Sequence, residues 1–176
     1  MHDERTANLL GATALSVSDL LLADVTAAAG TSVSGAAALA VLSRTPGLSV
    51  TELGRRVGLS QPAAARMVDS LQSRGLVQRR PTALRSVALV PTAAGKRHAR
   101  RGLAARTDRL STLVGRLSEA DRAALERLLG LVLEEVYGEV GSADLVCRLC
   151  DRTACVATED PCPIGQAERD HTTTTR

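Results

Sequence analysis

Residues 48–80 of this chain read LSVTELGRRVGLSQPAAARMVDSLQSRGLVQRR, and this stretch carries the local signals that decide the fold. Ser49 is followed three residues later by Glu52, which is the capping-box pattern of a helix start. Gly58 supplies a stop, because glycine adopts the left-handed conformation that ends many helices. These signals predict a short helix that begins just after Ser49 and ends at Gly58.

A second short helix is predicted directly after the first. Ser60 is placed to cap it, Pro62 falls in its first turn, where a missing N–H costs nothing, and Gly75 provides the stop. Two short helices joined by a glycine-containing turn make a helix-turn-helix. Helical spacing predicts an inward stripe of Ala64, Met67, Val68 and Leu71, and outward positions at Gln61, Ala63, Arg66 and Ser70.

Longer helices and a hairpin are predicted around this motif. Apolar segments at 76–80 and 86–90 flank a Pro-containing turn, which is typical of a small β-hairpin. Apolar periodicity and capping residues predict further helices over 5–29, 35–44, 92–115 and 118–138, the last one ended by Gly138 and Gly141. The expected fold class is therefore mainly α.

Positive charge is concentrated in the middle third of the chain. Residues 55–116 contain fourteen Arg or Lys and only two acids, whereas the rest contains eight basic residues and seventeen acids. A block this one-sided usually faces a polyanion. The chain has no Phe or Trp and one Tyr, so base-stacking platforms for single-stranded nucleic acid are not expected.

The order of these elements resembles the MarR family of winged-helix transcriptional regulators. The matching stretches are residues 48–80 and the sequence LRSVALVPTAAG at 84–95, and the resemblance covers roughly residues 5–140. It implies a winged helix-turn-helix with a β-hairpin wing, and long N- and C-terminal helices that form an intertwined homodimer. It also implies that the second helix of the motif enters the DNA major groove and that the wing reaches the minor groove.

The resemblance, together with the Cys-, Pro- and Thr-rich composition after Gly141, divides the chain into four expected parts. They are an N-terminal dimerisation helix (1–34), the DNA-binding domain (35–95), connecting and C-terminal dimerisation helices (96–140), and a cysteine-rich metal-binding loop with a disordered tail (141–176). The apolar stripes on the first and last long helices exceed what a small winged-helix unit buries alone, which also favours a dimer.

Candidate DNA contacts follow from residue chemistry and family position. Arg66 faces outward from the predicted recognition helix, and its forked guanidinium matches guanine. Arg85 corresponds to the wing arginine of the family, but Ala83 and Leu84 stand where the family usually has an orienting acid. The residues predicted to contact DNA are Arg55, Arg56, Ser60, Gln61, Ala63, Arg66, Arg79, Arg80 and Arg85.

All four cysteines lie in one stretch, CRLCDRTACVATEDPCP at 147–163, with the pattern C-x2-C-x4-C-x6-C-P. A two-residue gap lets two thiolates face one metal ion, and two more can complete a four-coordinate shell. The predicted metal ligands are Cys147, Cys150, Cys155 and Cys162. Four thiolates suit either an iron–sulfur cluster or Zn²⁺, and free thiols that oxidise under stress are the third possibility. The short final spacing resembles cluster-binding loops in regulators of the unrelated MerR family.

The sequence thus predicts a homodimeric, sequence-specific repressor that binds double-stranded DNA with an affinity tuned by metal or redox state at the cysteines. The alternative is a structural zinc site or a thiol oxidation switch, combined with a small-molecule effector. A protein-binding winged helix is disfavoured by the basic excess. The sequence shows no catalytic carboxylate pair, nucleophile motif or phosphate-binding glycine loop, so an enzyme is not expected.

The cellular compartment is predicted from the N-terminal sequence and the apolar runs. MHDERTANLL lacks the basic-then-apolar pattern of a signal peptide, and no unbroken apolar run approaches the roughly 20 residues of a membrane span. A soluble, cytoplasmic protein without membrane association is expected. Its cysteines should then serve as thiols or metal ligands rather than as structural disulfides.

Overall fold

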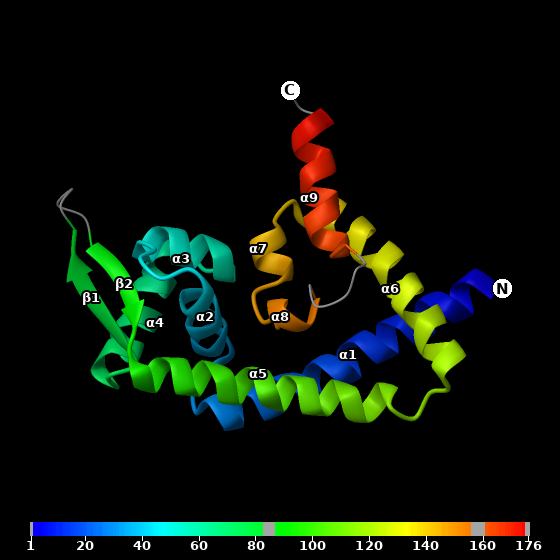
Figure 1. Cartoon of the computed structure of the whole chain (residues 1–176), viewed down its shortest axis with the longest axis horizontal. Helices are drawn as coiled ribbons and strands as arrows, with labels where there is room; N and C mark the ends of the chain where they lie inside the picture. Colours follow the sequence, from blue (N-terminus) through cyan, green and yellow to red (C-terminus); the bar gives the residue numbers. More distant parts are fainter. Residues whose placement is uncertain (1, 83–86, 156–160, 175–176) are drawn as a thin grey trace.

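The computed structural model describes residues 2–82, 87–155 and 161–174. This part of the chain is mainly helical with one two-stranded hairpin, which confirms the predicted fold class (Figure 1). In chain order the elements are α1 (His2–Ala29), α2 (Val33–Arg44), α3 (Val50–Val57), α4 (Gln61–Ser73), β1 (Val77–Pro81), β2 (Val87–Pro91), α5 (Ala93–Val114), α6 (Glu119–Val140), α7 (Ala143–Val146), α8 (Arg152–Cys155) and α9 (Pro163–Thr174).

The main hydrophobic core lies among α2, α3, α4 and the hairpin, at the left of Figure 1. Its largest fully buried side chains are aliphatic, and they include Leu39, Leu42, Leu53, Leu71 and Leu89. No buried polar or charged side chain occurs among the described residues. Leucine, valine and alanine therefore fill this core without aromatic side chains, as the composition of the chain requires.

The middle of β2 is joined to the connection between α2 and α3. Strands β1 and β2 pair antiparallel, with Val77 opposite Pro91 at the open end. Leu48 forms an additional bridge with Leu89, and the Leu89 amide donates to the Leu48 carbonyl oxygen at 2.9 Å. The wing thus continues directly from the core of the winged-helix unit.

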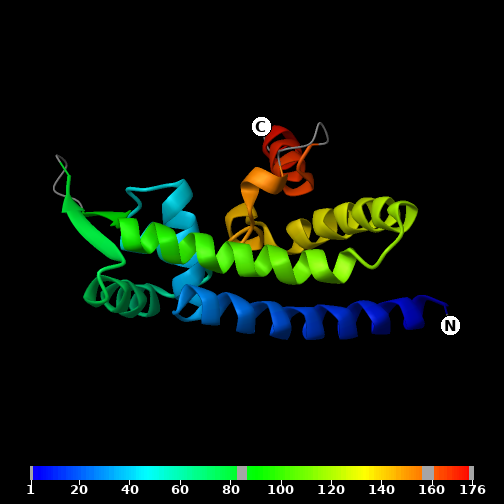
Figure 2. The same ribbon diagram turned by 60° about the horizontal axis from the view of Figure 1, so that its bottom comes forward.

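Helices α1 and α5 are long and lie side by side (Figure 2). The Arg109 guanidinium donates to Asp24 at 2.6 Å, and His98 Nδ1 lies 2.8 Å from the carbonyl oxygen of Ala29. The Asp24 hydrogen bond to Arg109 lowers the pKa of that carboxyl. These contacts fasten the C-terminal half of α1 to α5.

One described helix, Glu4–Ala29 within α1, is long and apolar enough to cross a membrane by length and composition. This corrects the expectation that no segment comes near such a length. A few polar residues interrupt this helix, so it contains no long unbroken apolar run although it is apolar on average. Packing against α5 and the ion pair at Asp24 give α1 a place in the protein fold.

Both α1 and α6 expose apolar side chains. On α1 these are Leu9, Leu10, Leu15 and Leu20, and on α6 they are Leu128, Leu129, Leu131, Val132, Val136 and Val140. Helix α6 runs past Gly138, which was expected to help end it, and ends at Gly141 with a left-handed φ of 63°. Gly138 is helical because a single glycine weakens a helix without breaking it.

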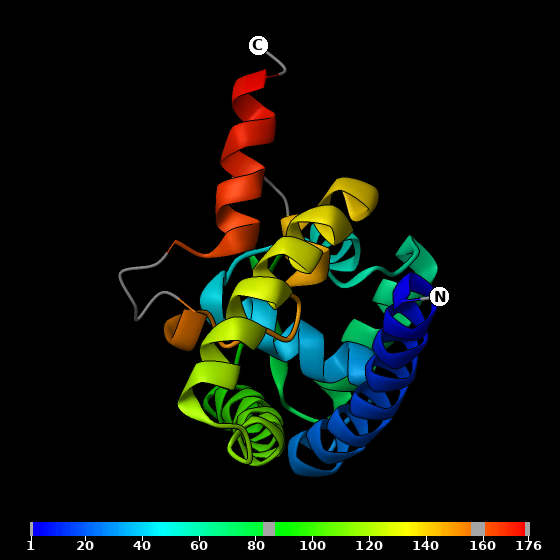
Figure 3. The same cartoon turned by 90° about the vertical axis from the view of Figure 1, so that its right-hand side faces the viewer.

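The described part of the C-terminal segment contains three helices, and residues 171–174, which were expected to be disordered, belong to the last of them. Helices α7 and α8 are single turns, whereas α9 spans Pro163–Thr174 and extends away from the body of the molecule (Figure 3). Pro163 occupies the first helical position, where proline is favoured. Ile164 is buried, and the rings of Tyr137 and His171 meet edge to face at 5.4 Å. These contacts with α6 explain why the tail is helical.

Candidate functional site

The helix-turn-helix forms through the local signals read from the sequence. The Ser49 hydroxyl accepts a hydrogen bond from the Glu52 amide at 3.1 Å, and Gly58 adopts φ 72° at the end of α3. The Leu59 amide then donates to the Gly54 carbonyl oxygen at 2.9 Å. A side chain at Gly54 would collide with the methyl group of Ala64, so this glycine allows α3 and α4 to pack closely.

Helix α4 presents two distinct faces, as predicted. The inward stripe Ala64, Met67, Val68 and Leu71 is buried in the core. Gln61 and Arg66 are exposed on the opposite side, and Ala63 is half-buried. Ser60 occupies the cap position, but its hydroxyl makes no capping hydrogen bond, which differs from the prediction. Pro62 lacks the N–H that would be one of the two usual donors.

Arg55 and Arg56 on α3 are engaged by two acids. Glu52 accepts from the Nε atoms of Arg55 at 2.9 Å and Arg56 at 2.8 Å. The hydrogen bonds from Arg55 and Arg56 lower the pKa of Glu52 to about 2. Asp144 of α7 lies within 3.4 Å of both guanidinium groups. Two predicted DNA contacts therefore belong to an ion-pair cluster.

The wing arginines differ in their surroundings. Arg79 donates to Asp69 at 2.7 Å and to Gln72 Oε1 at 2.5 Å, so its guanidinium is held against α4. Arg80 is exposed on β1. Arg85, the predicted wing-tip arginine, lies outside the described residues. In the described part of the wing, Arg80 is thus exposed to solvent, whereas the Arg79 side chain joins β1 to α4.

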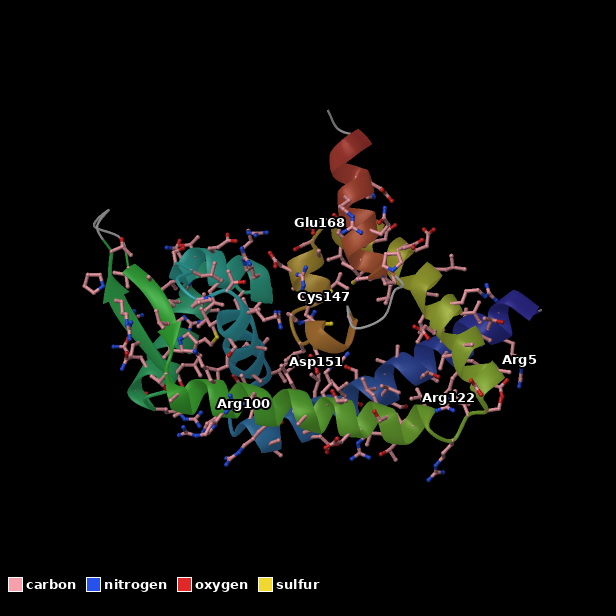
Figure 4. All side chains as sticks on the ribbon, viewed as in Figure 1. Arg5, Arg100, Arg122, Cys147, Asp151 and Glu168 are labelled. Carbon is pink, nitrogen blue, oxygen red and sulfur yellow. The ribbon has the colours of Figure 1, made fainter. Side chains whose placement is uncertain are left out.

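The four cysteines come together around one cavity of about 620 Å³. Cys147, labelled in Figure 4, follows α7. Cys150 comes three residues later, Cys155 ends α8 and Cys162 precedes α9. The Sγ atoms of Cys150 and Cys155 are 3.6 Å apart. Arg44 also lines the cavity. Residues separated by up to fifteen positions are thus gathered by three short helices.

Neighbouring thiols and burial shift the acidity of these cysteines. A hydrogen bond with Cys150 lowers the pKa of Cys147. The same contact, together with burial, raises the pKa of Cys150. Burial raises the pKa of Cys155 to about 11. Cys147 is therefore the thiol of this pair that more readily becomes the thiolate required for metal binding or nucleophilic attack.

The cysteine arrangement fits a metal site only in part. Two thiolates on a tetrahedral Zn²⁺ at about 2.3 Å lie roughly 3.7 Å apart, close to the Cys150–Cys155 separation. Across the described ranges, however, no three His, Cys, Asp or Glu side chains are clustered tightly enough to hold an ion. Four cysteines and the Cys150–Cys155 separation suit a thiolate site. The sulfurs of Cys147 and Cys162 would have to move closer to that pair to complete the coordination of an ion.

Comparison with known proteins identifies the winged-helix unit. The family model described as MarR family matches residues 29–85, from the end of α1 to the wing. This segment therefore resembles a MarR-family domain. No curated protein matches the chain. The resemblance found in the sequence is thus confirmed for the part of the chain that contains the helix-turn-helix.

Solved MarR-family structures extend the likeness beyond that domain. A MarR family protein from Bacillus stearothermophilus has a TM-score of 0.68 at 20% identity, covering 77% of this chain and 95% of that one. Rv2887 of Mycobacterium tuberculosis, solved in complex with DNA, has a TM-score of 0.56 at 27% identity, with coverages of 70% and 96%. MepR, a transcription regulator of the Staphylococcus aureus multidrug efflux pump MepA, has a TM-score of 0.65 at 16% identity, covering 74% of this chain and 97% of that one.

The MarR-family homologues are transcription regulators rather than enzymes, which agrees with the expectation from the sequence. Two residues of the site were missed by sequence reasoning. Arg44 donates to the carbonyl oxygens of Cys150 at 3.1 Å and Cys147 at 3.4 Å, and Asp144 pairs with the arginines of α3. These contacts join residues 88 to 106 positions apart, so no local sequence pattern could predict them.

Proposed function

We propose that this protein is a homodimeric transcriptional regulator that binds double-stranded DNA through α4, with an affinity tuned by a metal or iron–sulfur site on its four cysteines. The observation that carries DNA binding is the face of α4. Gln61 and Arg66 are exposed while the opposite stripe is buried, so a recognition surface is available without disturbing the core. The DNA complex of Rv2887, a solved relative in fold, supports the same reading.

The chemistry of this surface suits a DNA duplex. An outward arginine can bond the O6 and N7 atoms of guanine, which makes Arg66 the candidate base reader. The amides at the start of α4 can hold a phosphate, with Ser60 and Gln61 beside them. Arg80 lies on the adjacent wing, and the surrounding block of 55–116 is strongly basic. Affinity would come mainly from phosphate contacts and selectivity from Arg66.

The exposed apolar side chains of α1 and α6 support a homodimer. Leu15 of α1 is 72% exposed and Leu131 of α6 is 53% exposed, which is a large apolar surface to leave in water. A second copy of the chain, related by a twofold axis and packed along α1 and α6, would cover these apolar side chains. The dimer would also place two α4 helices on one side, as half-sites about 34 Å apart require.

The cysteine cavity supports a thiolate metal site. Cys147, Cys150, Cys155 and Cys162 would be the ligands, and Arg44 at the cavity wall would offset their negative charge. An iron–sulfur cluster would add one-electron redox chemistry, whereas Zn²⁺ would supply only a cross-link. Because the segment follows α6 directly, a change in its packing can alter the dimer, and with it the affinity for DNA.

Duplex binding across a KCl series tests the DNA part. Fluorescence anisotropy with a mixed-sequence duplex should show a steep salt dependence, with a log–log slope of about −0.9 per neutralised phosphate. On an operator selected with the wild-type protein, Arg66→Ala should lose about 10- to 100-fold in affinity. Arg122→Ala is the charge-matched control, because Arg122 lies at the far end of the molecule (Figure 4). A flat salt response, or equal losses in both variants, would overturn the proposal.

Metal content and visible absorption of the protein purified without oxygen test the cysteine part. Iron with sulfide and a brown colour indicates a cluster, and colourless protein with one equivalent of zinc indicates a structural ion. Cys150→Ser should remove the bound metal in either case. Metal-free protein whose cysteines oxidise to disulfides would instead support the thiol switch. Operator affinities that are equal in the loaded, apo and oxidised states would reject regulation through this site.

A further inference from the structure

The first turn of the cysteine segment sits against the helix-turn-helix of the same chain (Figure 1). Asp144 Oδ2 lies 3.4 Å from Arg55 Nη2 and 3.4 Å from Arg56 Nε. The Arg56 side chain is only 22% exposed, against 57% for Arg55. The carboxylate of α7 therefore covers part of the positive charge that α3 would otherwise offer to solvent.

Apolar packing fixes this contact in addition to charge. Leu145 Cδ1 lies 2.9 Å from the position that a Cβ on Gly58 would occupy, so the leucine methyl group fits where α3 ends in a glycine. Val57 and Leu145 also line a shared groove with Val140 at the end of α6. Helix α7 is thus docked at the turn that precedes the recognition helix.

The other side of the segment is fastened to α2. Arg44 donates to the carbonyl oxygens of Cys147 and Cys150, the two residues that begin the cysteine cluster. Any rearrangement of the cysteine turn therefore acts on Arg44 and on the position of α7 together. The ion pairs between Asp144 and α3 are the contacts through which such a rearrangement reaches the helix-turn-helix.

We propose that Asp144 is an autoinhibitory competitor for DNA phosphate at Arg55 and Arg56, and that undocking of α7 raises the affinity for duplex DNA. This inference rests on the proposed DNA-binding function. Glu52 also pairs with these arginines, but it lies three and four residues from them on α3 itself and is not part of the cysteine segment. Asp144 is the acid that arrives and leaves with that segment, so it is the one that can switch.

The small energy of exposed ion pairs limits how much Asp144 can change the affinity for DNA. Exposed ion pairs contribute little each, and here one carboxylate meets two arginines in each protomer. In a dimer, removal of both carboxylates should strengthen binding by about tenfold at low salt, with a steeper salt slope because the released arginines contact more phosphates. High salt should erase most of this gain.

The experiment compares full-length Asp144→Asn with the wild type on a mixed-sequence duplex over a KCl series. Glu126→Gln, an exposed acid of α6, is the matched control for the loss of one negative charge. We expect about tenfold tighter binding for Asp144→Asn and less than about twofold change for Glu126→Gln. Equal affinities of Asp144→Asn and wild type, or the same gain in both variants, would overturn the inference.

Two further variants separate competition from a general charge effect. Leu145→Ala leaves the charge unchanged and removes the apolar contact with Gly58, so it should also tighten duplex binding. In a background of Arg55→Ala with Arg56→Ala, the gain from Asp144→Asn should disappear, and a persistent gain would refute competition at these arginines. If the wild type itself binds no duplex at low salt, the proposed function fails. If it binds and Asp144→Asn behaves identically, only this inference fails.

Discussion

The winged-helix unit and the cysteine segment are held together by different means. Residues 33–92 enclose a core with Leu39, Leu42 and Leu71 almost fully buried. In residues 141–174, Ile164 is the one hydrophobic side chain of the described positions that is buried to this degree. A segment with so little core must draw its order from contacts with its neighbours or from a bound metal. The winged-helix unit therefore holds its own structure, whereas the structure of the cysteine segment depends on its surroundings.

The largest effect is expected from a cavity in the winged-helix core. Leu42→Ala should lower the free energy of unfolding by about 2–5 kcal/mol, because a fully buried leucine is removed from a packed site. Ile164→Ala should cost far less in global unfolding, since it loosens only α9. Urea denaturation at one protein concentration measures both. Similar losses for the two variants would show that the cysteine segment belongs to the same cooperative core.

The next effect concerns glycines in the two regions. A Cβ at Gly95 would fall on the carbonyl oxygen of Leu76, so Gly95→Ala should destabilise the winged-helix unit by about 1–3 kcal/mol. Nothing lies within 4 Å of a Cβ at Gly138 in α6, so Gly138→Ala should stabilise by about 0.5–1 kcal/mol. Thermal unfolding gives both signs. A stabilising Gly95→Ala would contradict the close approach of α5 to β1.

A smaller and localised effect is expected from loss of the proposed metal site. Cys150→Ser, or treatment with a chelator, should speed amide hydrogen exchange in 143–155 and 161–174 by about tenfold, because a thiolate site would no longer order this segment. Exchange in 33–82 should stay as in the wild type. Mass spectrometry of peptides resolves the two regions. Equal exchange before and after metal removal would mean that neighbouring helices alone order the segment.

The smallest effect lies in the acid response of α3. Arg55 and Arg56 lower the pKa of Glu52 from 4.5 to about 2, so its stabilising contribution is complete above pH 4.5 and is lost as pH falls towards 2. Glu52→Gln should therefore be less stable than wild type near pH 6, by under about 1 kcal/mol after solvent screening, and equally stable near pH 2. Urea midpoints at both pH values measure the difference. A difference that grows on acidification would contradict this sign.

The sequence signals that worked were local ones. Ser49 caps α3 as predicted, the helices after Thr92 and Ser118 start where they were expected, and the buried stripe of α4 follows its helical spacing. Capping and periodicity depend on neighbours a few residues apart, so one sequence suffices to find them. The cysteine spacing likewise predicted that the four thiols share one place, and they line one cavity.

The features that escaped prediction depend on distant partners. The basic block containing Arg55 and Arg56 predicted a surface open to DNA, whereas Asp144 meets both guanidinium groups from 88 or 89 residues away. Residues 171–176 were expected to be disordered because this threonine-rich end is polar, whereas residues 171–174 belong to α9 and the ring of His171 meets Tyr137 of α6, which is a tertiary contact. Sequence periodicity predicts where a helix forms, but it does not predict which other helix it will contact.

The bridge between Leu48 and Leu89 has a mechanical consequence for target search. The Leu89 backbone bonds both Gly47 and Leu48, so the hairpin is held against the link between α2 and α3. Under the proposed function, each protomer would then contact a duplex with its wing and winged-helix core as one rigid unit. Because the wing could not move to compensate, the dimer alone would set the separation of the two units, and operators should tolerate little variation in the distance between their halves.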